Sequence, residues 1–583
     1  MIADKDLQSI QEARALVTQA FEAQKQLSKF AQEQVDSVID AMAVTVQAQC
    51  ERLGALAVEE TGYGIPADKT IKNRFAAENV YRYIRPLKTV GILREDRQSG
   101  IVEIAAPAGV VCAIIPSTNP TSTAIYKILI CIKARNCIVL SPHPAAVRCI
   151  NEVARVMREA AREAGLPEGA INCMQQPTIE GTTELMKHKL TSLILATGGT
   201  GLVRAAYSSG KPAFGVGPGN VPAYVDRSAD VEKAVKDILT GKCFDNGTLC
   251  SSEQSIVADQ PVAQRVLEEL KKNGGYILNA EEREKLDRLV MTPNRSLNTA
   301  IVGKAARRIA EMAGISVPDG TRALVGKIDG VGRDYPLSME KLSPILGFFV
   351  VDGWEQGCER CNEILRFGGT GHTLAVHAND PKVIQEFGLH KLAFRICVNT
   401  PATHGSIGLT TNLVPSMTLG CGTWGGNITT DNISPLNLIN IKRLAYEARP
   451  VNAGNAVSAP LVSNQGSAQP AHTSSPVVGS PSRELIREVV EEFLKKKSSS
   501  KQGGASGSEA PAVNPVPVVR TEQPGASISP PPSGPKIKPL EFVCEEDVRR
   551  AVDRREKLTV NARTIITPAA RDLGEEKQVF HWI

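Results

Sequence analysis

The sequence predicts an α/β protein with a doubly wound parallel sheet, followed by a disordered C-terminal extension. Over residues 1–447, short β-branched runs alternate with helical patterns, which is typical of parallel strands joined by helices. Thirteen of the 36 prolines lie between residues 451 and 540, where Ser, Gly, Ala and Val are also frequent. We therefore expect a compact α/β body over 1–447 and a flexible tether over most of 448–538.

The elements of the body follow one another in a strand–helix–strand order. Ala, Gln, Glu and Leu recur at helical spacing near the N-terminus, and later apolar runs are bounded by Pro or Gly. The predicted order is helices over 6–57, strands over 109–115 and 134–140, a helix over 145–164 and a strand over 191–196. No internal repeat is present in the sequence.

The composition excludes several classes of protein. Of the 583 residues, 42% are hydrophobic and 22% are charged, and the formal net charge is only +5. This weak charge argues against nucleic acid or a membrane as a partner, and no apolar run approaches the roughly 20 residues that span a bilayer. The N-terminus lacks the apolar segment of a secretory signal, and the 13 cysteines are scattered. We expect reduced thiols in a cytoplasmic protein.

Two short motifs could carry chemistry, and each also has a purely structural interpretation. The turn Thr197-Gly198-Gly199-Thr200-Gly201 joins a predicted strand to a helix, where free backbone N–H groups can bind a phosphate or simply form a turn. Cys250 follows a polar, glycine-containing turn and precedes an apolar strand, which suits an exposed nucleophile. Spacing alone does not set it above Cys112, Cys243 or Cys421, because a buried thiol is the default.

Four motifs in register resemble one enzyme family. They occur in the order Pro116-Ser117-Thr118-Asn119-Pro120, Ala196-Thr197-Gly198-Gly199, Asn246-Gly247-Thr248-Leu249-Cys250 and Gly420-Cys421-Gly422-Thr423-Trp424-Gly425-Gly426-Asn427. Together they resemble the CoA-acylating branch of the aldehyde dehydrogenase superfamily, most of all the acetaldehyde and propionaldehyde dehydrogenases of bacterial microcompartments. The resemblance covers residues 6–447. It implies a dinucleotide-binding domain over 1–228, a catalytic domain over 229–420, an oligomerisation segment over 421–447, and a homodimer or tetramer.

The resemblance also implies roles for individual residues. Cys250 matches the nucleophile that attacks the aldehyde, and Asn119 matches the amide that holds the developing oxyanion. Glu340 matches the glutamate that holds the nicotinamide ribose, with a solvated surface charge as the alternative. The remaining positions that match the cofactor site are Pro116, Thr118, Ser141, Thr197, Gly198 and Gly199. NAD is the expected cofactor, and the segment around Ser141 leaves the 2′-phosphate question open.

One departure from the hydrolytic members of the superfamily points to coenzyme A as the acyl acceptor. Those enzymes carry a Glu-Leu-Gly-Gly-Lys segment whose glutamate activates water. The aligned segment here is 215–220, so we expect that Gly215 stands where that base would be. A thiol has a useful thiolate fraction at neutral pH without such a base, whereas water does not. The resemblance thus implies a short aldehyde as substrate: acetaldehyde, propionaldehyde or a hydroxylated C3 aldehyde.

Two further features have weaker interpretations. His372 could assist proton transfer at the thioester step or could be a structural histidine. Cys358 and Cys361 form a lone CxxC, and without a second pair we expect no metal site.

The C-terminal extension contains two islands. Residues 481–497 carry one apolar stripe formed by Leu485, Ile486, Val489, Val490, Phe493 and Leu494. This amphipathic helix, set between flexible linkers over 448–480 and 498–538, resembles the encapsulation peptides that bring enzymes into microcompartment shells. A helix docked on its own body is the alternative. Residues 539–583 form a small segment of unknown role, too short for a strong core.

The sequence leaves two other functions open. The chain could be a hydrolytic NAD(P)-dependent aldehyde dehydrogenase that gives a free acid, and Gly215 argues against this. It could instead be a catalytically degenerate scaffold for shell assembly, and an intact Cys250 and Asn119 argue against that.

Overall fold

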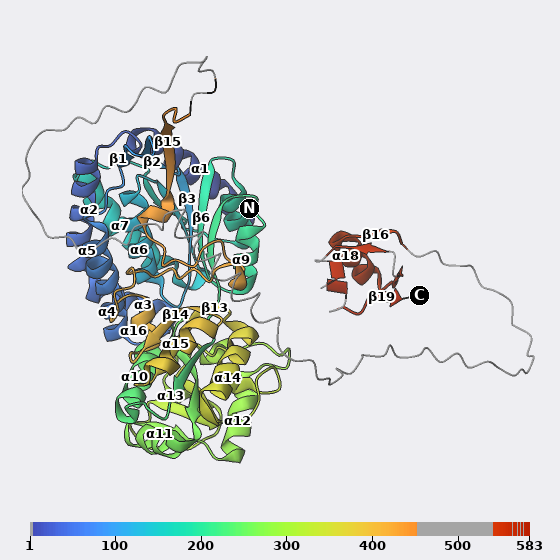
Figure 1. The fold of residues 1–583 in the computed structure, drawn as a ribbon. Helices are drawn as coiled ribbons and strands as arrows, with labels where there is room; N and C mark the ends of the chain where they lie inside the picture. The colour runs from blue at the N-terminus through green and yellow to red at the C-terminus, as the bar shows by residue number, and fades with distance from the viewer. Residues whose placement is uncertain are drawn as a thin grey trace, which may run out of the picture. The chain divides into compact units, whose positions relative to one another are not determined.

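The computed structural model describes residues 4–449, 451, 540–561, 564–567, 570–571, 573–574 and 577–582. The chain divides into two compact units, Met1–Ser458 and Ala459–Ile583 (Figure 1). The predicted helix over 481–497 and the linker over 498–538 lie outside the described residues, as does 448–480 apart from 448, 449 and 451.

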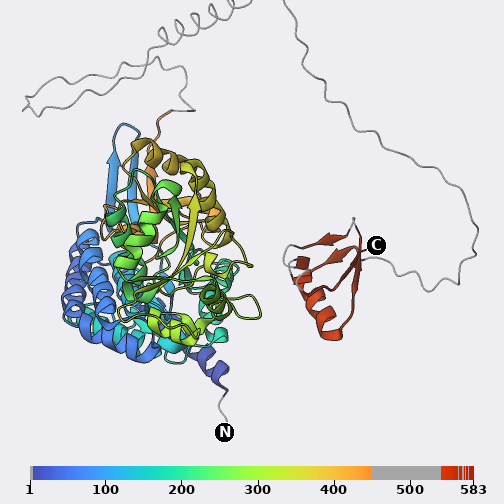
Figure 2. The ribbon, with the colours of Figure 1, turned by 90° about the horizontal axis from the view of Figure 1, so that it is seen from below.

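Helices make up the first part of the chain, as predicted. A buried stripe that includes Ala13, Val17 and Ala20 faces the core from the first helix, whose N-terminus is capped by Asp4. In chain order the helices are α1 (Lys5–Leu27), α2 (Gln32–Gln47), α3 (Cys50–Thr61), α4 (Pro66–Arg74), a π-helical turn (Phe75–Val80) and α5 (Tyr81–Ile84). Figures 1 and 2 show blue helices along one flank of the first unit; Figure 1 labels α2 and α5 on that flank and α1 on the other side, near the N-terminus.

A five-stranded parallel sheet follows, in the order β5-β4-β3-β6-β7. Its strands are fully or largely buried, because helices cover both faces. The bounds are β3 (Val110–Ile115), β4 (Ile138–Pro142), β5 (Ile171–Cys173), β6 (Thr191–Thr197) and β7 (Ala213–Val216), joined by α6 (Pro120–Lys133), α7 (Val147–Glu163), α8 (Ile179–Lys187) and α9 (Thr200–Tyr207). The doubly wound sheet expected from the sequence is confirmed.

One predicted strand begins later than expected. Ala134 is the C-cap of α6 rather than the first residue of a strand, and Arg135 has a left-handed backbone with φ of 58°. Asn136 completes this turn, since its Oδ1 accepts a hydrogen bond of 2.9 Å from the Gly109 N–H. The predicted run over 134–140 begins at the C-terminal end of α6, so strand β4 begins only at Ile138.

A seven-stranded parallel sheet forms the other half of the first unit, in the order β10-β11-β12-β9-β8-β13-β14. Its strands are β8 (Val221–Val225), β9 (Glu253–Asp259), β10 (Gly275–Ile277), β11 (Ala323–Lys327), β12 (Ile345–Val351), β13 (Gly371–His377) and β14 (Ala393–Val398). Around it lie α10 (Val231–Cys243), α11 (Gln260–Lys272), α12 (Ala280–Val290), α13 (Ala306–Met312), α14 (Gly353–Gly368), α15 (Pro381–His390) and α16 (Ala402–Ser406). The sheets change between β7 and β8, so the predicted boundary at residue 228 falls after the first strand of the second sheet.

A small antiparallel sheet is formed by segments far apart in the sequence. Strand β15 (Ile439–Ala445) pairs with β2 (Ile101–Pro107), which also pairs with β1 (Gly91–Asp96). The predicted oligomerisation segment therefore contributes an outer strand, with an exposed Leu444. Figure 1 shows β15 and its partners at one end of the first unit.

The second unit has a small core of its own. Strand β16 (Phe542–Val543) pairs with β18 (Ile565–Ile566), and β17 (Leu558–Val560) pairs with β19 (Phe580–Trp582), both in parallel. Helix α18 (Glu545–Arg554) packs with these strands around Val543, Val548, Val560, Ala570 and Val579. Across the described part of both units, no helix combines the length and apolar composition needed to cross a membrane.

Candidate active site

A cleft of about 760 Å³ lies where the carboxyl ends of the five-stranded sheet face loops of the second sheet. Such ends are the usual ligand sites of open parallel sheets. The cleft brings together nine residues that the sequence singled out: Pro116, Thr118, Asn119, Ser141, Thr197, Gly198, Gly199, Cys250 and Glu340. Of the thirteen cysteines, Cys250 alone lines this cleft, which separates it from Cys112, Cys243 and Cys421.

The loop before Cys250 has an unusual backbone. A short helical turn (Phe244–Gly247) contains Asp245 and Asn246 in the left-handed region, with φ of 51° and 52°. Non-glycine residues are rarely held there, and such strain is retained where the surroundings enforce it. Asn246 is held by a 3.0 Å hydrogen bond from its Nδ2 to the Gly303 carbonyl. The Asp245 N–H donates to the Asp68 carboxylate at 2.7 Å.

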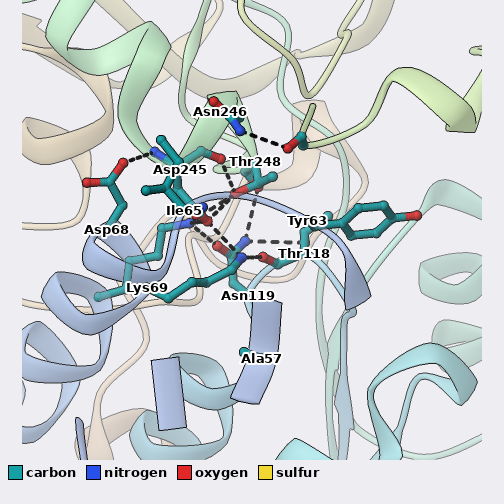
Figure 3. A network of polar contacts seen from close by, with 12 residues as sticks. Ala57, Tyr63, Ile65, Asp68, Lys69, Thr118, Asn119, Asp245, Asn246 and Thr248 are labelled. Carbon is teal, nitrogen blue, oxygen red and sulfur yellow. Dashed lines mark hydrogen bonds and ion pairs between the residues drawn. The ribbon is translucent and has the colours of Figure 1, made fainter. Parts of the chain in front are cut away.

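The Asp245 carboxylate is the centre of a buried polar network (Figure 3). It is fully buried and accepts from Lys69 Nζ at 2.7 Å, from the Ile65 N–H at 2.8 Å and from Thr248 Oγ1 at 2.6 Å, as well as from Lys72 Nζ. Burial opposes its ionisation, but Lys72 and Lys69 hold the pKa of Asp245 below its ordinary value. The network thereby fastens the loop of the nucleophile to helix α4.

Asn119 is positioned by bonds to both ends of its amide. It occupies the N-cap of α6, but its side chain does not cap the helix. Its Nδ2 donates to the Thr248 carbonyl at 3.1 Å and to Thr118 Oγ1 at 3.2 Å, and its Oδ1 accepts from Lys72 Nζ at 2.6 Å. The donor end of the amide is thus turned toward the loop that carries Cys250.

The surroundings of Cys250 favour the protonated thiol. Burial raises its pKa to about 12, and the negative charge of Glu340 adds to this, while Arg395 opposes it. Glu340 is half-buried at the cleft and accepts from the Gly219 N–H at 3.2 Å. Burial raises the pKa of Glu340 to about 7, so its charge varies around neutral pH. The reactivity of the thiol is therefore coupled to the charge beside it.

The other end of the cleft fits the pyrophosphate of a dinucleotide. Gly199 is the N-cap of α9, and no side chain caps that helix terminus. A Cβ at Gly199 or Gly201 would meet no atom within 4 Å, so the backbone is open to a ligand. Thr197 Oγ1 is buried without a hydrogen-bond partner, which suits a polar ligand atom nearby. Ser141 bonds instead to Thr182, with 2.8 Å between the hydroxyl oxygens.

The position of Gly215 corrects one prediction. Gly215 lies in β7 and does not line the cleft; a Cβ there would come within 2.9 Å of Val203 and Tyr207 on α9. Its neighbours Val216 and Gly217 do line the cleft, and neither carries a carboxylate. Glu340 is the single carboxylate among the described residues that line it. A side chain at position 215 would point toward α9. The lack of a second carboxylate in the cleft therefore does not depend on Gly215.

His372 is placed outside the cleft lining but near the nucleophile. It is fully buried in β13, and burial lowers its pKa to about 3. Its Nδ1 pairs with Thr373 Oγ1 at 2.9 Å. A Cβ at Gly219 would lie 3.0 Å from its ring and 2.2 Å from the Cys250 carbonyl oxygen, so the ring and that carbonyl approach the same glycine. The neutral imidazole cannot donate a proton as an imidazolium near neutral pH.

Lys69, Lys72 and Asp245 were not singled out as functional from the sequence. The lysines lie three residues apart on a polar helix, a pattern that predicts an exposed face, yet they are only 1% and 2% exposed. Asp245 directly precedes the motif Asn246–Cys250, and a carboxylate beside a glycine-containing turn was the signal available. Within the described ranges, no group of three His, Cys, Asp and Glu side chains is placed to hold a metal ion.

Comparison with known proteins identifies the family. A model described as "Aldehyde dehydrogenase family" matches residues 1–326. The chain belongs to the aldehyde dehydrogenase family. It is 44% identical over 445 residues to the bifunctional aldehyde-alcohol dehydrogenase AdhE of Escherichia coli K12, an alignment that covers 76% of this chain. The chain spans about half of that relative, because the alignment covers 50% of its length.

Solved structures of this aldehyde dehydrogenase family share the fold over most of the chain. An acetylating aldehyde dehydrogenase from Geobacillus thermoglucosidasius is 53% identical with a TM-score of 0.76, and the match covers 77% of this chain and 99% of that one. A propionaldehyde dehydrogenase from the fucose utilisation bacterial microcompartment of Clostridium phytofermentans is 30% identical with a TM-score of 0.68, covering 74% and 97%. The aldehyde dehydrogenase-like fold expected from the sequence is confirmed.

The attachment of Asp245 to α4 can be tested at Gly64. Gly64 has φ of +82°, and a Cβ there would lie 1.9 Å from Asp245 Oδ1. Gly91 has a similar φ of +73° with no atom within 4 Å, so it is a matched control. Both Ala variants should lose about 1–2 kcal/mol for the left-handed backbone. Gly64→Ala should lose at least about 2 kcal/mol more, measured by urea unfolding, because it displaces a buried ion. Equal losses would contradict the buried attachment.

The electrostatic coupling of Glu340 to Cys250 can be tested by alkylation. In Glu340→Gln the amide oxygen can still accept from Gly219, but the negative charge is gone and the Cys250 pKa should fall. At about pH 8.5, iodoacetamide should modify Cys250 roughly two- to tenfold faster than in the wild type, since each pKa unit changes the thiolate fraction tenfold. At about pH 5.5 the rates should converge, because wild-type Glu340, whose pKa is about 7, is then protonated as well. Mass spectrometry with Cys544 as internal reference measures both rates, and a pH-independent difference would be inconsistent with this coupling.

Proposed function

We propose that this protein is a CoA-acylating aldehyde dehydrogenase that converts a short-chain aldehyde, coenzyme A and NAD to an acyl-CoA and NADH. The observation that carries the proposal is the cleft itself. It joins Cys250, an Asn119 amide whose NH₂ end faces the Cys250 loop, and an uncapped helix terminus, and Glu340 is its single carboxylate among the described lining residues.

The residues of the cleft can carry each stage of acyl transfer. Cys250 Sγ forms a bond to the aldehyde carbon, and the Asn119 Nδ2 and the Cys250 N–H stabilise the oxyanion of the thiohemiacetal. Bound NAD would accept the hydride that leaves this carbon, which gives a thioester on Cys250. The thiol of coenzyme A then attacks the thioester carbon as a thiolate, and the Cys250 thiolate leaves. One proton is released over the cycle.

Three features support coenzyme A rather than water as the acyl acceptor. Val216 and Gly217, which face the cleft from the segment aligned with the hydrolytic base, have no acid–base group. Glu340 already accepts a hydrogen bond from Gly219, which restrains it. The similar Geobacillus enzyme is itself named as acetylating. The hydrolytic alternative would need Glu340 to activate water.

Thr197, Gly198 and Gly199 would hold the pyrophosphate of the cofactor, and Glu340 the nicotinamide ribose, with Pro116, Thr118 and Ser141 lining the same cleft. NAD is the proposed cofactor. The cleft near Ser141 carries His143 and no carboxylate among its described lining residues, so a 2′-phosphate would meet no like charge there. His372 remains a proposed auxiliary group for the thioester step, acting as a neutral imidazole.

We further propose that the enzyme is cargo of a bacterial microcompartment, held to a shell protein by residues 481–497, and works as a homodimer or tetramer. The amphipathic pattern of 481–497 supports the first part, together with the similar enzyme from a Clostridium phytofermentans microcompartment. The exposed outer strand β15 supports the second.

Production of NADH from propionaldehyde and NAD, with and without coenzyme A, tests the acyl acceptor. We expect strict dependence on coenzyme A and propionyl-CoA as product. Cys250→Ala should abolish turnover while NAD still binds, and Asn119→Ala should lower kcat by about 100- to 1000-fold, as for other oxyanion-binding amides. Equal rates with free propionate as product would assign the protein to the hydrolytic enzymes instead.

Deletion of residues 481–497 tests the targeting proposal. Turnover in solution should stay within about twofold of the full chain, because residues 481–497 follow the predicted catalytic body only after the predicted linker over 448–480. Co-purification with shell protein should be lost. A variant with Leu485, Val489 and Phe493 changed to Ser keeps the length of the segment and should behave like the deletion. Unchanged shell association would refute the role of this helix.

A further inference from the structure

We propose that Lys72 is a positioning residue that holds the Asn119 amide in the orientation needed to bind the oxyanion. Lys72 also fastens that amide to the loop of Cys250. The inference rests on the proposed acyl-transfer function of Cys250 and assigns a new role to a residue of α4.

All three N–H groups of the Lys72 ammonium have an acceptor. Lys72 Nζ lies 2.6 Å from Asn119 Oδ1 and 3.0 Å from Thr248 Oγ1, and it also contacts Asp245 Oδ2. Asn119 is the N-cap of α6, whereas Thr248 and Asp245 belong to the loop that ends in Cys250. The two proposed donors to the oxyanion, one from each segment, are therefore joined through one buried cation.

The charge of Lys72 decides which end of the amide faces it. An ammonium group can only donate hydrogen bonds. It can therefore pair with the carbonyl oxygen of the Asn119 amide but not with the NH₂ group. The Nδ2 group is then directed to the Thr248 carbonyl and Thr118 Oγ1, at 3.1 and 3.2 Å. A charge-assisted bond to Oδ1 also polarises the amide and makes its N–H groups stronger donors.

The groups around Lys72 act on its charge in opposite directions. Burial lowers its pKa to about 7, and Asp245 opposes this shift. Asp68 also favours the charged form, while Lys69 on α4 opposes it, and Lys72 in turn contributes to the lowered pKa of His404 on α16. Lys72 also lies over the Phe244 ring, with 5.5 Å between Nζ and the ring centroid.

Lys69 is a matched control on the same helix. It is equally buried and bonds to the same Asp245 oxygen at 2.7 Å. Its other acceptor is the Thr118 carbonyl, and its Nζ makes no bond to Asn119. Replacing either lysine removes one cation from Asp245, but only replacement of Lys72 releases the amide. If the rate fell only because a buried positive charge was removed, the loss of rate should be the same in the Lys69 and Lys72 variants.

The experiment compares Lys72→Met and Lys69→Met in wild-type and Asn119→Ala backgrounds. Turnover of propionaldehyde, NAD and coenzyme A gives kcat and KM. Release of p-nitrophenolate from p-nitrophenyl acetate gives acylation of Cys250 without NAD or aldehyde, with Cys250→Ala as the blank. This second assay reports on the amide even if the aldehyde reaction fails, so failure of the two proposals can be told apart.

We expect Lys72→Met to lower both rates by at least about tenfold with little change in KM, and Lys69→Met by less than about threefold. In the Asn119→Ala background, Lys72→Met should change either rate by less than about twofold, because the group it positions is gone. Lys72→Gln, which can still donate to Oδ1, should recover part of the rate and serves if the Met variant does not fold.

Two results would overturn the inference. One is an equal loss in the Lys69 and Lys72 variants. The other is a Lys72 effect of undiminished size in the Asn119→Ala background, which would show that Lys72 acts independently of the amide.

Discussion

A single buried carboxylate organises the catalytic half of this protein. Asp245 has no exposed surface, so its charge is tolerated only because cations and N–H groups surround it. Apart from Thr248, its partners come from helix α4 and the residue before it, while Asp245 itself lies 173 residues beyond Lys72. Asp245 stands five residues before Cys250. Removal of any one of its partners would therefore disturb the loop that carries the nucleophile. The cleft therefore depends on an ionic contact as well as on the apolar packing of the two sheets.

This arrangement explains why a strained loop can be stable. Asp245 and Asn246 occupy a backbone region that costs non-glycine residues free energy. Each of them has its side chain bonded to a distant segment, at Ile65 and Gly303 respectively. The polar contacts offset the strain and leave Cys250 at the cleft, where regular strand geometry in β9 would have carried it into the sheet.

Much of the fold could be predicted from the sequence because apolar runs and their Pro and Gly boundaries are local signals. The start of β4 was wrong because the residues before Ile138 end α6, and local hydrophobicity does not distinguish a helix end from a strand. Gly215 was predicted to stand where the hydrolytic base would be, but it does not line the cleft, because a side chain on β7 at that position would face Val203 and Tyr207. Residues from three of the four motifs meet in the cleft, whereas no residue of Gly420–Asn427 lines it, and Lys69 and Lys72 were not predicted. Their pairing with Asp245 joins residues far apart in the sequence, so no periodic pattern of residue types predicts it.

The raised pKa of Cys250 has a consequence for the durability of the protein. Peroxides oxidise thiolates far faster than thiols, and oxidation beyond the sulfenic acid is irreversible for most proteins. A nucleophile whose pKa is about 12 spends nearly all of its resting time as the resistant form. Burial and the neighbouring carboxylate lower the nucleophilicity of the resting thiol. The same two features protect it from oxidation between turnovers.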